Sequence, residues 1–221
     1  KATGVPLAKL ATKVMIGKTL EELVLVREVV PKHISVKEAV LPFDRFPDVD
    51  TLLGPEMKST GEVMGVDMDF GIAYGKSQFG ARQRLPVSGT VFVSVKDKDK
   101  EAVLPVASQF KKLGFNIVAT SGTSRFLASR GLENKPVNKV SLGRPHVVDA
   151  IKNGEIQLVI NTGTGDDAKR DGYQLRRAAL KFQLPYTTTI AGALAICKAI
   201  TALKEKKLSV KTLQEYNSET N

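Results

Sequence analysis

Hydroxyl side chains and a glycine follow an apolar run in the middle of the sequence, and they are well suited to hold an anion. Thr120, Ser121 and Thr123 surround Gly122 directly after the run 115–119, where a helical pattern begins. A strand that turns into a helix in this way places backbone N–H groups at the positive end of the helix dipole, where phosphate binds well. The turn therefore predicts either a phosphate site or a simple cap formed by Ser121 or Thr123.

Other apolar runs in the second half are also followed by polar residues. These residues are Lys96, Lys98 and Lys100 after the first run, Lys139 by the third, Asn161 and Thr164 after the fourth, and Thr188 and Thr189 after the fifth. If the runs are parallel strands, their carboxyl ends meet at one edge of a sheet. Lysines, hydroxyls and an amide at one edge have the composition of a phosphate pocket with a polar wall for a sugar or base.

The elements that must position these residues alternate between short apolar runs and amphipathic helices. The predicted strands are 90–95, 115–119, 136–140, 155–160 and 186–188, and the predicted helices include 100–113 with an interruption near Pro105, 146–152, 170–182 and 190–203. This alternation predicts an α/β fold with a doubly wound, Rossmann-like sheet of five parallel strands and helices on both faces.

The first 82 residues have a different texture and predict a smaller α+β region. Its expected elements are a helix from Leu7 to Gly17, a strand within 29–43, a loop rich in Pro, Gly and Asp at 44–65, and a helix from its cap Asp69 to about residue 81. Glu38 lies in the strand, where a carboxylate either faces solvent or, in a cleft, holds an ammonium group. We place a linker at 83–88 and a second domain at 89–221.

Composition narrows the classes of partner. The formal net charge of +10 favours anionic ligands. Because the lysines are scattered and tryptophan is absent, we expect no nucleic-acid groove. No apolar run or signal peptide indicates a membrane or secretion, so we expect a cytoplasmic protein. No cysteine or histidine cluster has metal spacing, no catalytic motif is found, and His33 is expected at the surface or an interface.

Taken in chain order, four motifs resemble the C-terminal end of the large subunit of bacterial-type carbamoyl phosphate synthase. They are GPEMKSTGEVMG at 54–65, ATSGT at 119–123, GRPH at 143–146 and INT at 160–162. The resemblance covers nearly the whole chain. It implies that residues 1–82 are the tail of the second ATP-grasp unit and that residues 89–221 are the allosteric domain, of the methylglyoxal-synthase-like fold.

The resemblance also implies a function. The parent enzyme makes carbamoyl phosphate from glutamine or ammonia, bicarbonate and ATP, for pyrimidine and arginine synthesis. Its C-terminal domain binds UMP as inhibitor and IMP as activator at one overlapping site, and ornithine as activator beside the synthetase unit. The implied partners are a glutaminase small subunit and further copies of the large chain. ATP and Mg²⁺ or Mn²⁺ serve the full-length enzyme, and no catalytic residue is expected within this chain.

Individual residues carry these expectations. The nucleotide contacts are expected at Lys100, Thr120, Thr123, Lys139, Asn161 and Thr164, and the ornithine contacts at Glu38, Tyr186 and Thr188. The family often has a threonine where this chain has Gly163, and Thr164 is expected to take its place.

Two other functions compete with this one. A lyase similar to methylglyoxal synthase shares the fold and the phosphate loop, but it needs a carboxylate base after the third strand. Here the corresponding stretch offers no acid before Asp149, which we expect to be helical. A ligand-independent oligomerisation module is the other alternative, and light scattering with and without nucleotide would separate it from an effector domain.

Overall fold

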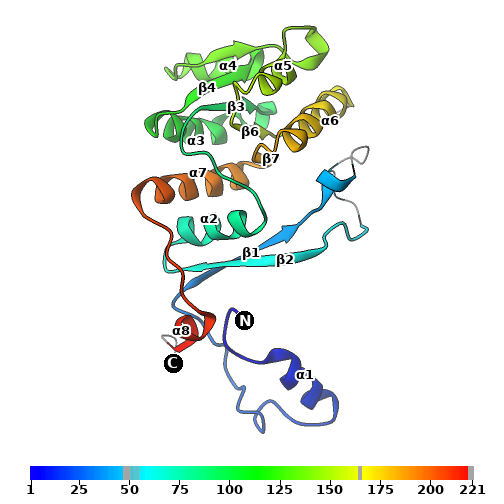
Figure 1. Ribbon diagram of the computed structural model, residues 1–221, viewed down its shortest axis with the longest axis vertical. Helices are drawn as coiled ribbons and strands as arrows, with labels where there is room; N and C mark the ends of the chain where they lie inside the picture. The colour runs from blue at the N-terminus through cyan, green and yellow to red at the C-terminus, as the bar shows by residue number, and fades with distance from the viewer. Residues whose placement is uncertain (47–50, 52, 54, 164–165, 219–221) are drawn as a thin grey trace.

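The computed structural model describes residues 1–46, 51, 53, 55–163 and 166–218. Figure 1 shows a sheet with its helices at one end of the molecule and a β-hairpin with an N-terminal arm at the other. Thr164, which is predicted to contact a nucleotide, lies outside the described residues.

A five-stranded sheet forms the centre of the larger region. Its strands are β3 (Thr90–Ser94), β4 (Asn116–Thr120), β5 (Lys135–Val137), β6 (Leu158–Asn161) and β7 (Tyr186–Thr187). They lie in the order β5-β4-β3-β6-β7, and every neighbouring pair is parallel. The predicted sheet is therefore confirmed. The chain winds outward from β3 through β4 to β5 and then returns to the other side of β3, which creates a topological switch point between β3 and β6.

Helices cover both faces of this sheet. They are α3 (Lys100–Lys112), α4 (Ser121–Ser129), α5 (Val147–Lys152), α6 (Asp166–Lys181) and α7 (Ile190–Glu205). Side chains alternate along β3, so Val91 and Val93 belong to the core that includes residues of α3 and α7. Phe92 points the other way, into the core that includes residues of α5 and α6. The result is a three-layer α/β/α arrangement, which leaves the carboxyl ends of the strands open for a ligand.

Helix α3 corrects one sequence prediction. Pro105 lies inside the helix, which continues from Lys100 to Lys112 without the expected interruption. A proline here removes one backbone hydrogen bond. The helix persists because Val103, Val106 and Phe110 are buried against the sheet, and this packing holds both sides of the proline in place.

The N-terminal region is built on an antiparallel β-hairpin. Its elements are α1 (Leu7–Met15), β1 (Ile34–Val40), the 3-10 turn η1 (Phe43–Arg45), β2 (Gly61–Asp67) and α2 (Phe70–Gly80). Strand β1 and helices α1 and α2 were predicted, and Asp69 caps α2 by accepting a hydrogen bond from Ile72 N at 3.1 Å. Strand β2 was missed, because residues 61–65 were interpreted as part of a loop.

Two close contacts of backbone with backbone join these elements. A Cβ at Gly65 would lie 1.9 Å from the carbonyl oxygen of Ala73, so β2 touches α2 directly. A Cβ at Gly71 would lie 2.6 Å from the carbonyl oxygen of Lys198, so α2 in turn touches α7. The N-terminal region and the sheet region are therefore packed through α2 and α7, and the division at residues 83–88 stays a prediction.

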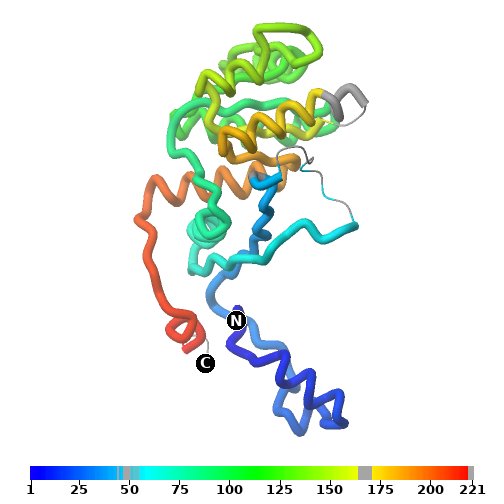
Figure 2. The backbone as a smooth tube through the Cα atoms, turned by 45° about the vertical axis from the view of Figure 1, so that its right-hand side comes forward, coloured from blue at the N-terminus to red at the C-terminus, as the bar shows by residue number. Residues whose placement is uncertain are grey.

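The C-terminal segment returns to the N-terminal region, as Figures 1 and 2 both show. Its helix α8 (Leu213–Ser218) buries Tyr216, whose hydroxyl accepts a hydrogen bond from Lys76 Nζ at 3.2 Å. The Tyr216 ring meets the edge of His33, with ring centroids 5.4 Å apart. His33 is buried and its Nε2 lies 2.8 Å from the carbonyl oxygen of Ala2, so its predicted surface position is wrong. Within the described residues, no helix combines the length and apolarity needed to cross a bilayer.

Candidate functional site

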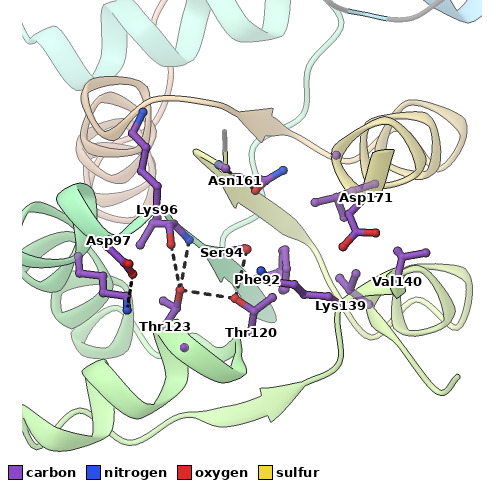
Figure 3. A pocket seen from close by; sticks show the side chains of 17 residues that line it. Phe92, Ser94, Lys96, Asp97, Thr120, Thr123, Lys139, Val140, Asn161 and Asp171 are labelled. Atoms are coloured by element: carbon purple, nitrogen blue, oxygen red, sulfur yellow. Dashed lines mark hydrogen bonds and ion pairs between the residues drawn. The ribbon is translucent and has the colours of Figure 1, made fainter. Parts of the chain in front are cut away.

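A cavity of about 280 Å³ lies at the carboxyl ends of β3, β4 and β6, beside the topological switch point (Figure 3). Its polar lining consists of Ser94, Lys96, Asp97, Lys100, Thr120, Thr123, Lys139, Asn161 and Asp171. Its apolar lining includes Phe92, Val140, Val147 and Leu175. The volume is close to the lower end of the range of about 300–1,000 Å³ for small-molecule sites.

The start of α4 forms one wall of this cavity. Thr120 occupies the N-cap position, and its side chain makes no capping hydrogen bond. Its hydroxyl instead donates to Ser94 Oγ at 3.2 Å, while Thr123 Oγ1 accepts from the backbone N–H of Val95 at 3.2 Å. The alternative that Ser121 or Thr123 caps the helix is therefore wrong, since both lie inside it. The first turn of α4 thus faces the cavity without a side-chain cap, which suits an anion.

Lys100 brings a positive charge to the same turn. Its ammonium would lie 3.8 Å from a Cβ built at Gly122, in the first turn of α4. The ammonium also lies 2.8 Å from Asp97 Oδ1. The hydrogen bond and charge of Lys100, with a smaller contribution from Lys139, hold the pKa of Asp97 below its ordinary value. The charges of Lys100, at the start of α3, and of Lys139 therefore act on one carboxylate at the edge of the cavity.

The opposite wall comes from β6 and α6. Asn161 follows the apolar residues of β6, and its side-chain oxygen accepts a hydrogen bond from Gly163 N at 3.3 Å. Asp171 lies on α6 and accepts a hydrogen bond from Ser141 Oγ at 2.8 Å. This wall therefore contributes an amide, which can donate and accept, and a carboxylate, which accepts, whereas the α4 side presents donors and positive charge.

The structure brings together the predicted phosphate residues that it describes. Lys100, Thr120, Thr123, Lys139 and Asn161 all line the cavity. Within the described part of the chain, Lys98, Thr188 and Thr189 do not line it. Thr189 instead caps α7 by accepting a hydrogen bond from Gly192 N at 3.0 Å. The first four strand ends thus converge as expected, and the fifth does not.

Two carboxylates of the cavity, Asp97 and Asp171, were missed from the sequence. Asp97 lies between Lys96 and Lys98, and the sequence prediction named only the lysines. Asp171 lies within the predicted helix 170–182, where its position on one face gave no sign of a cavity. Asp97 could have been found from its spacing to Lys100, because residues three apart in a helical turn are neighbours.

Comparison with known proteins places the chain in a family. Residues 102–188 match the MGS-like domain family. The carbamoyl phosphate synthase large chain of Nostoc sp. is 57% identical over 98% of this chain, which corresponds to 20% of that protein. The large chain of Archaeoglobus fulgidus is 52% identical over 100% of this chain and 20% of its own length. This chain is homologous to the carbamoyl phosphate synthase large chain.

A third relative indicates which part of the large chain this homologue matches. In Aquifex aeolicus, a protein named carbamoyl phosphate synthase large chain, C-terminal section, is 51% identical over 98% of this chain and 44% of its own length. This chain therefore spans about a fifth of the full large chains above and less than half of the Aquifex protein. The resemblance predicted from the motifs is confirmed.

The MGS-like match does not include all of the sheet and cavity residues. It begins at residue 102, after Lys100 and after the whole of β3. The structure nevertheless places β3 between β4 and β6, at the centre of the MGS-like sheet. The cavity of this carbamoyl phosphate synthase homologue is thus formed partly by residues that precede the matched domain.

The residues predicted to bind ornithine have separate surroundings in the structure. Glu38 Oε2 accepts a hydrogen bond from Gln78 Nε2 at 2.8 Å, and burial raises the pKa of Glu38. Burial, together with the charge of Glu38, raises the pKa of Tyr74 to about 12. Tyr186 instead packs against the core beside α5 and α6, and Thr188 is exposed. The ornithine site therefore stays a prediction.

The geometry around Asp149 does not suit the base of a lyase. Asp149 lies in α5, as expected, and accepts hydrogen bonds from Arg144 Nε at 3.1 Å and from the backbone N–H of His146 at 3.0 Å. These contacts, led by the Arg144 hydrogen bond, lower the pKa of Asp149 to about 2. A carboxylate held in its ionised form is a weak base, and Asp149 does not line the cavity.

Proposed function

We propose that the cavity binds the phosphate of a nucleoside monophosphate and that this binding regulates a carbamoyl phosphate synthase. The observation that carries the proposal is the convergence of Lys100, Thr120, Thr123, Lys139 and Asn161 from separate parts of the chain on one cavity. Helices α3 and α4, strands β4 and β6 and the segment after β5 must fold together to produce this arrangement. A cluster of donors and lysines at a topological switch point is the chemistry expected of a phosphate site.

The lining also supports a division of the cavity into subsites. Lys100 and the first turn of α4 would hold the phosphate, since both present positive charge or N–H donors. Asn161 and Asp171 would accept hydrogen bonds from sugar hydroxyls. The apolar side chains of Phe92, Val140 and Val147 would contact the base.

The proposal extends to the effectors. UMP would act as inhibitor and IMP as activator at this one cavity, and ornithine would bind at Glu38, Tyr186 and Thr188. A ligand changes an enzyme only through its different affinity for two states of the protein. The two nucleotides would therefore have to favour opposite states of the same enzyme.

At the level of the whole enzyme, the proposal rests on the relatives. We propose that the parent protein is a cytoplasmic, ATP-dependent synthase that uses glutamine or ammonia, bicarbonate and Mg²⁺ or Mn²⁺ for pyrimidine and arginine synthesis. A glutaminase small subunit and further large chains would be its partners. Among the residues that the structure describes, no group of three His, Cys, Asp or Glu side chains could hold a metal ion. We therefore assign no metal ligand to this chain.

Calorimetric titration of the protein with UMP, IMP and ornithine tests the proposal. We expect UMP or IMP to bind, and we expect Lys139→Ala to weaken that binding by about 1.5–3 kcal/mol, the contribution of one charge-assisted contact. Lys98→Ala is the matched control, because Lys98 is exposed and lies outside the cavity lining. Absence of binding by both nucleotides, or equal losses in the two variants, would contradict the proposal.

A further inference from the structure

Lys100 already has an anionic partner inside the cavity. Its ammonium lies 2.8 Å from Asp97 Oδ1, and both residues line the cavity (Figure 3). We propose that Asp97 is an internal competitor for the ligand's phosphate: its carboxylate holds Lys100 until an incoming phosphate displaces it. This inference rests on the proposed function, and it adds a residue that sets the affinity of the site.

The two partners differ in how firmly the protein holds them. The side chain of Lys100 is only 22% exposed, and its ammonium is close to the first turn of α4. The side chain of Asp97 is 94% exposed, and its carboxylate touches the protein only where it meets Lys100 among the described contacts. An exposed carboxylate regains full hydration when it turns away, so leaving Lys100 costs it little. Lys100 is thus the fixed partner and Asp97 the exchangeable one.

The other charges around the Lys100–Asp97 ion pair favour replacement of Asp97 by a phosphate. Lys139, which directly precedes the 3-10 turn η3 (Val140–Leu142), also acts on the Asp97 carboxylate. Lys96 is paired with Asp99 at 3.5 Å, and Asp171 lies on the opposite wall. A phosphate monoester carries about 1.5–2 negative charges at pH 7 and would repel a carboxylate that stayed beside Lys100. The phosphate therefore competes with Asp97 for the same ammonium.

A competing role and a positioning role for Asp97 predict opposite changes in nucleotide affinity when the carboxylate is removed. The direction of that change decides between the two roles. If Asp97 merely orients Lys100 for the ligand, Asp97→Asn will weaken binding. If Asp97 competes with the ligand, Asp97→Asn will strengthen it. Because an exposed ion pair is weak, we expect UMP to bind about two- to fivefold more tightly to Asp97→Asn than to the unmodified protein.

Glu133→Gln provides a matched control for this change in charge. Glu133 lies 2.8 Å from Lys111 Nζ, its side chain is 83% exposed, and it does not line the cavity. Both variants remove one exposed, lysine-paired carboxylate and raise the net charge equally. Calorimetry with UMP, IMP and inorganic phosphate should therefore show tighter binding in Asp97→Asn only. Equal gains in both variants would mean that general charge is the cause and would overturn the inference.

The remaining outcomes separate the inference from the proposed function. If the unmodified protein binds a nucleotide but Asp97→Asn binds it equally or more weakly, the competitor role is wrong and the proposed function stands. If neither protein binds any of the three probes, both are wrong. A carboxyl NMR titration gives a second reading, since saturation with UMP should raise the pKa of Asp97 when Lys100 leaves it. An unchanged pKa under saturation would also overturn the exchange.

Discussion

Replacing Lys100 with methionine removes a charge close to the first turn of α4 while keeping most of the aliphatic stem. A charge-assisted hydrogen bond to phosphate contributes about 1.5–3 kcal/mol. Lys100 must first leave Asp97, from which it lies 2.8 Å, so the lower half of that range applies. At about 1.4 kcal/mol per tenfold change, Lys100→Met should weaken UMP binding by about 10- to 40-fold.

The assay is isothermal titration calorimetry of the unmodified protein, Lys100→Met and Lys98→Met in the same buffer. Lys98 lies two residues before Lys100, is exposed and does not line the cavity, so its loss reports the general effect of one positive charge. The buried residues of α3 are Val103, Val106, Ala107 and Phe110, so neither substitution should alter the thermal unfolding of the protein. Equal UMP affinity in Lys100→Met and Lys98→Met, with both variants folded, would refute the placement of phosphate at α4.

Two further predictions concern the N-terminal region. Gly65→Ala should lower the free energy of unfolding by about 1–3 kcal/mol or more, because its methyl group would collide with a main-chain oxygen 1.9 Å away. Gly61→Ala in the same strand meets nothing within 4 Å and should change stability little in the same urea titration. Burial raises the pKa of Glu38 above 4.5, so its ionised form lowers stability as the pH rises through that pKa. Glu38→Gln should therefore stabilise the protein at neutral pH, with the difference disappearing below pH 4.5, and a constant difference across this range would contradict the burial effect.

Most of the sheet region could be predicted from its sequence, because the signal was local. Buried parallel strands appear in the sequence as short apolar runs. Because the strands are parallel, the residues that follow them lie at the same edge of the sheet. Strand β2 could not be predicted in the same way. Its glycines resemble a loop, and Gly65 is needed there only because α2 passes against it. The contact between Gly65 and α2 is a tertiary contact, and no local sequence pattern indicates it.

The lysine, threonine and asparagine side chains of the site could be predicted from the sequence, whereas its carboxylates were missed. Thr120 and Asn161 end strands and Lys100 follows one, and strand ends converge by topology. Asp171 reaches the cavity from the face of a helix, and its orientation depends on how α6 packs against the sheet. The exposed Thr188 follows β7, the edge strand of two residues, and its loop lies outside the cavity lining. Position along the chain was thus informative for the residues at the ends of β3, β4, β5 and β6 and not for those after β7.

The contact between α2 and α7 bears on how motion would spread through this molecule. A joint made from main chain against main chain has no rotamers that can change to absorb a displacement, and protein interiors compress very little. Helix α7 starts just after the edge strand β7, and the carbonyl of Lys198, about midway along α7, lies beside Gly71. A displacement of α7 would therefore move α2 and the β-hairpin together, as one rigid body.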